Sequence, residues 1–193
     1  SPLLPSFLPA RGNPRWLTRF ERPVRIAASG TPTASDLRRI DEAAAALALL
    51  MAPTPVRVVP ETTDANIVVR FVAREEWPTL IGEDPVLADA VGVTVPSTNR
   101  RGQITSSQVV VDPTIAQPER NSTIVHELLH AVGVNHSSCA GSLMYAGPPD
   151  AARRVQWSLS ALDQAVVRTL YRAELSSGMR AADVQRAVVP TAA

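Results

Sequence analysis

Residues 126–136 read His-Glu-Leu-Leu-His-Ala-Val-Gly-Val-Asn-His. His126 and His130 are four residues apart, so on a helix their rings project from one face and can bind the same ion. Gly133 is where such a helix has to end, because glycine adopts left-handed dihedral angles without a clash of a β-carbon. The chain that turns there can bring back His136 as a third nitrogen ligand. Three imidazoles with one open coordination position are typical of a catalytic zinc site rather than a structural one.

Glu127 follows the first histidine directly, close enough to reach a water molecule held on the same ion. The three histidines of the chain all lie in this segment, whereas histidines in unrelated core positions would be scattered. HExxH alone arises by chance in roughly one of a few hundred chains, and the glycine and third histidine lower this to about one in 10⁵. Apolar residues on another side of the same helix can face the core: Ile124, Val125, Leu128, Leu129 and Val132.

This motif, HExxHxxGxxH, resembles the signature of the metzincin metallopeptidases, which is followed by a Met-turn. Residues 142–145, Ser-Leu-Met-Tyr, are similar to that turn. The chain looks closest to the matrixins, in which the third histidine is followed by serine, here Ser137, and the turn reads Leu-Met-Tyr. The similarity in sequence covers about residues 120–171, and we interpret the chain as a bacterial matrixin-like protein.

The resemblance implies roles for residues outside the histidine motif. Met144 would form an apolar floor under the three ligands, with an ordinary core position as the alternative. Asp163 would hydrogen-bond the Met-turn. Tyr145 would be structural, because the zinc-binding tyrosine of other metzincins is expected one residue later; a role near the transition state is the alternative. A second, structural zinc is expected to be absent, because no histidine is left to bind it.

The predicted reaction is hydrolysis of a peptide bond in a protein or peptide substrate. Zinc lowers the pKa of a bound water to about 7. Glu127 would accept a proton as this water attacks the peptide carbonyl, and would pass it to the leaving amine. The alternative is a zinc-binding pseudo-peptidase or protein-binding module whose cleft is blocked by residues 1–20 or 74–89. Retention of Glu127 favours the enzyme, because zinc binding alone does not need it. A role without metal would require the motif to be a coincidence.

The substrate would lie extended along an edge of the sheet as an added strand. By element order Ala90–Val95 is the candidate edge strand, with an interior strand as the alternative. Residues 146–157 would wall the pocket beside the scissile bond. Arg153 and Arg154 there either favour acidic substrates or are solvated surface residues. Cys139 is either a redox-sensitive or metal-blocking thiol or a small buried apolar residue.

The pattern of apolar residues predicts a mixed α+β fold. The order of the expected strands and helices is similar to that of the metzincin upper subdomain. The resemblance therefore implies a metzincin-like fold, with a twisted five-stranded mixed sheet, a backing helix and an active-site helix, then a small C-terminal subdomain with the Met-turn and a final long helix. The expected strands are Arg22–Ala28, Val56–Val59, Asn66–Ala73, Val91–Val95 and Gln103–Val111. The first expected helix is capped by Ser35 or Asp36 and runs to about Met51. The others run from about Pro118 into the histidine motif, from about Ser160 to Glu174, and from about Ala181 to Val188. Residues 74–89 are expected to be polar turns.

A chain of 193 residues with 45% hydrophobic content suits one domain. Trp16 and Phe20 are expected to pack onto its body. The predicted organisation is an irregular N-terminal arm 1–20, a catalytic domain 21–175 divided into upper (about 21–133) and lower (about 134–175) subdomains, and a C-terminal extension 176–193.

Composition excludes several other classes. A net charge of +1 gives no reason to expect nucleic acid as a partner. No apolar run approaches the roughly 18 residues of a membrane span, and one cysteine excludes a disulfide within the chain. We expect a monomer. The resemblance, together with a start at Ser1 instead of methionine, leads us to expect a secreted or periplasmic protein, although the chain itself carries no signal peptide.

Overall fold

The computed structural model describes residues 16–82, 90–146 and 157–188. Within them five strands form one sheet in the order β2-β1-β3-β5-β4. Their bounds are β1 Val24–Gly30, β2 Val56–Val58, β3 Ile67–Phe71, β4 Gly92–Thr98 and β5 Ile104–Val111. The pairs β1–β2, β1–β3 and β3–β5 are parallel, and β4 runs antiparallel to β5. The predicted five-stranded mixed sheet is therefore confirmed, and β4 is an edge strand as expected.

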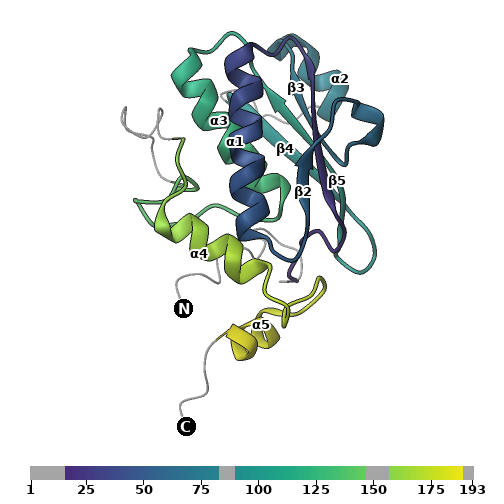
Figure 1. Ribbon diagram of the computed structural model, residues 1–193, viewed down its shortest axis with the longest axis vertical. Helices are drawn as coiled ribbons and strands as arrows, with labels where there is room; N and C mark the ends of the chain where they lie inside the picture. The colour runs from purple at the N-terminus through teal and green to yellow at the C-terminus, as the bar shows by residue number, and fades with distance from the viewer. Residues whose placement is uncertain (1–15, 83–89, 147–156, 189–193) are drawn as a thin grey trace.

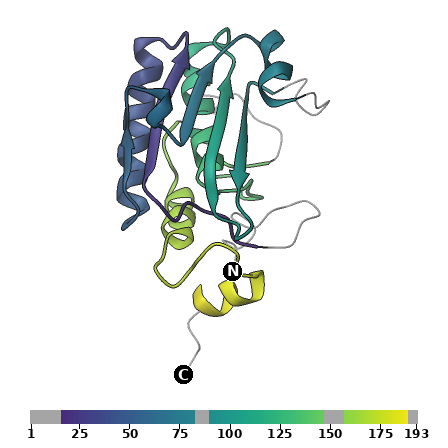
Figure 2. The same cartoon turned by 90° about the vertical axis from the view of Figure 1, so that its right-hand side faces the viewer.

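The helices of the described residues are α1 Ala34–Leu50, α2 Trp77–Ile81, α3 Gln117–Ala131, α4 Ala161–Leu170 and α5 Ala181–Val188. Helices α1 and α3 pack on each other and on the sheet, with α4 across their lower ends and α5 farther down (Figure 1). Figure 2 shows α1 along one side of the sheet and α4 and α5 below it. None of these helices is long and apolar enough to cross a membrane.

The core lies between the sheet and the helices. Alternate residues of β3 show which face is covered: Ile67, Val69 and Phe71 are at most 1% exposed, whereas Val68 and Arg70 are half-buried. This alternation is expected of a strand whose side chains point to opposite faces of the sheet. Helix α3 packs against β4 and β5 of this sheet, and these contacts fix the position of the helix.

Helix α1 begins earlier than predicted, at Ala34, because Thr33 rather than Ser35 or Asp36 is its N-cap. The Thr33 hydroxyl accepts a hydrogen bond from the Asp36 N–H, and the Asp36 carboxylate accepts one from the Thr33 N–H. This capping box makes Asp36 the third helical residue and not the cap.

The prediction of polar turns at residues 74–89 was wrong for residues 74–82, the part of this segment that the structure describes. A 3₁₀ turn at Arg74–Glu76 leads into α2. Pro78 suits the first turn of a helix. The Trp77 side chain is buried and donates its ring N–H to the Val72 carbonyl at 3.1 Å. A buried aromatic residue thus holds a short helix that the polar composition did not indicate.

The last long helix was also predicted wrongly: α4 ends at Leu170, not at Glu174. At this end the Arg19 side chain donates from Nη1 to the carbonyls of Leu170 at 2.8 Å and Arg172 at 3.0 Å. Arg19 thus satisfies carbonyl groups that the end of the helix leaves without a partner inside it. The short helix predicted at Ala181–Val188 is confirmed as α5.

The described parts of the N-terminal arm and the C-terminal extension pack into the same core. Leu17 exchanges backbone hydrogen bonds with Met179 and Gly178, both of 2.8 Å. Phe20 is fully buried, as predicted, and so is Val184. The division of residues 21–175 into two subdomains stays a prediction.

Candidate metal centre

The three histidines of the chain converge on one point. His126 and His130 lie on α3, and His136 lies on the loop beyond its end. The Nε2 atom of His136 is 3.2 Å from Nε2 of His130 and 3.3 Å from Nε2 of His126. Within the described residues these three side chains form a group that could hold a metal ion. The structure therefore brings together all three predicted ligands.

The turn that returns His136 depends on Gly133. This residue has φ of +101°, in the region that favours glycine. Its N–H bonds the His130 carbonyl at 3.0 Å, and the chain reverses immediately after α3. A β-carbon built at this position would lie 2.3 Å from the carbonyl oxygen of Thr18. Backbone conformation and close packing therefore both require glycine here.

Backbone carbonyls fix the orientation of two of the rings. Nδ1 of His126 lies 3.0 Å from the Leu143 carbonyl, and Nδ1 of His130 lies 2.7 Å from the Val134 carbonyl. Because a carbonyl oxygen can only accept, each Nδ1 carries the hydrogen and each Nε2 keeps its lone pair. These contacts could not be predicted from the sequence, because every residue has a backbone carbonyl and its type does not show which carbonyl accepts the hydrogen bond.

The surroundings keep the rings uncharged. Burial lowers the pKa of His126 and His136. Burial, with the neighbouring rings of His126 and His136, lowers the pKa of His130 to about 3. Neutral imidazole is the form that binds metal ions. At neutral pH the lowered pKa values thus favour the form of all three rings that can bind a metal ion.

Glu127 is buried, with 6% of its surface exposed. Burial raises the pKa of Glu127 to about 7, against the effect of a hydrogen bond from Thr94. The Thr94 hydroxyl lies 2.8 Å from both Oε2 and the backbone oxygen of Glu127. Sequence reasoning missed Thr94 and its neighbour Gly92. The available signal was a glycine and a small polar residue alternating with valines in a predicted strand.

The loop after His136 is tied to the predicted Met-turn. The Ser137 N–H donates to the Met144 carbonyl at 2.6 Å, and the Ala146 N–H donates to the Ser137 carbonyl at 2.9 Å. Met144 is 1% exposed, and Tyr145 is half-buried. The placement of Met144 as a floor under the rings stays a prediction.

Asp163 makes the hydrogen bonds to this turn that the resemblance implied. Its Oδ2 accepts the Leu143 N–H at 3.0 Å, and its Oδ1 accepts the Ser142 hydroxyl. The same carboxylate closes a capping box at the start of α4, where it accepts the Ser160 N–H at 2.9 Å. One buried side chain therefore joins α4 to the turn.

Cys139 does not belong to the group of metal-binding atoms found in the described residues. It is exposed, so its prediction as a small buried apolar residue was wrong. The proposed pocket wall at 146–157, including Arg153 and Arg154, lies outside the described residues except for its first and last positions.

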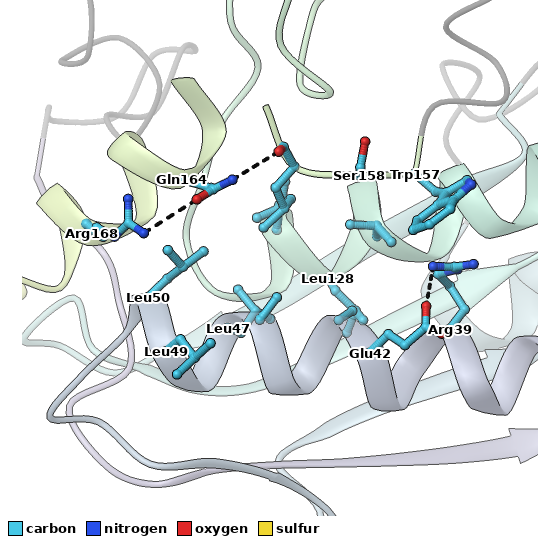
Figure 3. A pocket seen from close by; sticks show the side chains of 15 residues that line it. Arg39, Glu42, Leu47, Leu49, Leu50, Leu128, Trp157, Ser158, Gln164 and Arg168 are labelled. Atoms are coloured by element: carbon cyan, nitrogen blue, oxygen red, sulfur yellow. Dashed lines mark hydrogen bonds and ion pairs between the residues drawn. The ribbon is translucent and has the colours of Figure 1, made fainter. Parts of the chain in front are cut away.

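A cavity of about 330 Å³ lies between α1, α3 and α4 (Figure 3), and its lining residues do not include the histidines. Leu47, Val125 and Leu129 are among its apolar lining residues. At its rim the Arg39 guanidinium lies 3.8 Å from the centre of the Trp157 ring. This cavity is therefore separate from the histidine cluster.

Comparison with known proteins identifies a family but no activity. No curated protein matches the chain. The family described as "Protein of unknown function (DUF2927)" matches residues 9–190. The match includes every residue of the histidine cluster and nearly the whole chain, and the chain therefore belongs to the DUF2927 family.

Proposed function

We propose that this protein is a zinc-dependent endopeptidase. The observation that carries the proposal is the convergence of three ring nitrogens, with Nε2 of His136 at 3.2 Å from that of His130 and 3.3 Å from that of His126. Nitrogens at the corners of a tetrahedron about a zinc ion, at the usual 2.0–2.1 Å, are separated by about 3.3–3.4 Å. The two separations from His136 thus match the spacing of ligands of such an ion.

The surroundings of the rings support a metal ligand role over a structural one. Lone pairs that face one another repel unless a cation lies between them. Metal-binding histidines usually donate their second ring N–H to a carbonyl or carboxylate, and His126 and His130 do so. Imidazole ligands suit zinc, copper, iron and nickel. Three of them with an open position favour catalytic zinc.

Glu127 supplies what a purely structural site would not need. When bound, zinc acidifies a water molecule and polarises a carbonyl oxygen. The Glu127 carboxylate would take the proton of the attacking water and return it to the leaving amine. Burial shields this carboxylate from bulk solvent, so its charge acts in a medium of low polarity.

The edge strand offers a place for the substrate. Strand β4 stands at the end of the sheet order and is paired with β5 on one side. An extended peptide can add to such an edge through backbone hydrogen bonds. The order of the elements and the likeness of residues 126–145 to the metzincin motifs support the same proposal. A secreted or periplasmic location and a monomeric state stay predictions.

Two substitutions test the mechanism. Glu127→Gln should keep zinc and lose hydrolysis by about 10²–10⁴-fold, because it removes the general base. His130→Ala should lose both zinc and hydrolysis. Glu119→Gln, which makes the same chemical change on the same helix, is the matched control and should behave as the parent. A Glu127→Gln variant as active as the parent would contradict the mechanism. Zinc without cleavage in the parent would favour a zinc-binding module.

A further inference from the structure

The carboxyl group of Glu127 is held from the edge strand of the sheet. Thr94 of β4 places its hydroxyl oxygen 2.8 Å from Oε2 of Glu127 and 2.8 Å from the backbone oxygen of the same residue. One hydroxyl group thus contacts both ends of the glutamate and keeps its side chain folded toward its own backbone. Because threonine is β-branched and stiff at χ1, the hydroxyl itself has few alternative positions.

Strand β4 approaches α3 closely at this point. A β-carbon at Gly92 would lie 2.4 Å from Cγ2 of Thr123 and 3.0 Å from Cγ of Glu127. Residues two apart on a strand face the same side, so Gly92 and Thr94 both face α3. Val95 faces the other side and is 41% exposed. The glycine allows the approach, and the threonine uses it to reach Glu127.

We propose that Thr94 is a positioning residue that holds the Glu127 carboxylate in its reactive orientation. This inference rests on the proposed function, because it assigns Glu127 the role of general base. A neutral, short side chain suits the task, since it donates a hydrogen bond without adding a charge beside the carboxylate. Thr94 also lies on β4, at whose free edge an extended peptide would bind. The same strand would therefore position both the general base and the substrate.

The expected effect is on the chemical step rather than on substrate binding. Thr94 faces α3 and not the free edge of β4, so its side chain is not a binding contact for a peptide added there. A misplacement of about 1 Å in a catalytic group can cost about 10²-fold in rate. Loss of the hydroxyl should therefore lower kcat and leave KM unchanged.

Thr94→Val removes the hydroxyl and keeps the shape of the side chain, whereas Thr94→Ser keeps the hydroxyl. Thr94→Val should lower kcat by about tenfold to 10²-fold with unchanged KM, bound zinc and Tm. Thr94→Ser should restore most of the rate. Val95→Thr, on the opposite face of the same strand, is the matched control and should behave as the parent. If Thr94→Val does not fold, Thr94→Ala takes its place.

Crystal structures of the parent and Thr94→Val provide a second readout that does not depend on activity. The Glu127 carboxylate should leave its position beside β4 in the variant. An unmoved carboxylate, a parental kcat in Thr94→Val, or a Thr94→Ser variant as slow as Thr94→Val would each overturn the proposal. If the parent hydrolyses no peptide, the proposed function fails. The position of the Glu127 side chain in the two crystals then decides the inference about Thr94 on its own.

Discussion

The Asp163 carboxylate accepts the N–H of Leu143 at 3.0 Å, and the carbonyl of Leu143 accepts the Nδ1 hydrogen of His126 at the same distance. Asp163 is 1% exposed and also accepts the Ser142 hydroxyl. A side chain on α4 therefore fixes the turn whose backbone orients one of the three rings. Support of this kind, beyond the direct ligands, tunes metal affinity in proteins.

Asp163→Ala should weaken zinc binding by about 10–100-fold, because the turn that orients His126 loses its anchor. It should also lower the free energy of unfolding by about 3 kcal/mol or more, since several buried donors are left unpaired. Competition for zinc with a chromophoric chelator and urea unfolding measure the two effects. Asp183→Ala, which removes an acid paired with Arg186 on the exposed face of α5, is the control. Equal zinc affinity in both variants would contradict the anchoring role.

Gly133→Ala should destabilise the fold by about 3 kcal/mol or more. A left-handed conformation costs a non-glycine residue about 1–3 kcal/mol, and the new β-carbon would lie 2.3 Å from the Thr18 carbonyl oxygen. Gly141→Ala is the matched control, because a β-carbon there has no heavy atom within 4 Å among the contacts considered. Urea unfolding compares the two. Similar stability for both variants would mean that the chain accommodates a side chain at 133.

Asp36→Asn tests the link between α1 and α3. The carboxylate pairs with Arg120 at 2.8 Å, and the two side chains are 1% and 7% exposed. Loss of one partner of a buried pair leaves an uncompensated charge and typically costs about 3–5 kcal/mol. The variant should therefore be less stable than the parent at pH 7, as measured by urea unfolding. Asp41→Asn, on the exposed side of the same helix, is the control and should change little.

The effect of Asp36 should also depend on pH. Burial by itself raises the pKa of Asp36, but hydrogen bonds from Arg120, Gln117 and Thr33 outweigh it and hold the pKa below the ordinary value of 3.8. A group whose pKa is lower in the folded state stabilises the protein above its unfolded pKa. The contribution should thus be complete above about pH 4 and be lost as the pH falls through the folded pKa. A stability difference between parent and Asp36→Asn that did not shrink as the pH falls below about 4 would contradict this origin.

Met144→Ala should cost about 2–5 kcal/mol, because a fully packed side chain is replaced by a cavity. The residue is 1% exposed in the core. Met144→Leu has nearly the same volume and should cost less than about 1.5 kcal/mol. Thermal unfolding of both variants measures the difference, and two equal losses would show that volume is not the determining property at this position.

The parts of the site that depend on local spacing could be predicted from the sequence. Two histidines four residues apart must share a helix face, and a glycine is needed where the backbone reverses. His126, His130 and Gly133 follow from these two facts alone. Strand β4 could be placed because its valines alternate, and its position at the sheet edge follows from element order.

Contacts between distant segments could not be predicted in the same way. The hydroxyl of Thr94 reaches Glu127 only because β4 and α3 are brought together by the whole sheet. The carbonyl at the end of α4 accepts a hydrogen bond from Arg19, which is 151 residues away from Leu170 in sequence. Neither partner carries a local signal that points to the other.

The most direct test measures two quantities on one purified sample: bound metal by elemental analysis, and peptide hydrolysis with a mixed fluorogenic peptide library. We expect one zinc per chain, with cleavage that stops when a chelator removes the ion and returns when zinc is restored. Absence of bound metal after reconstitution with zinc would contradict the proposed function, because that function requires His126, His130 and His136 to bind the ion.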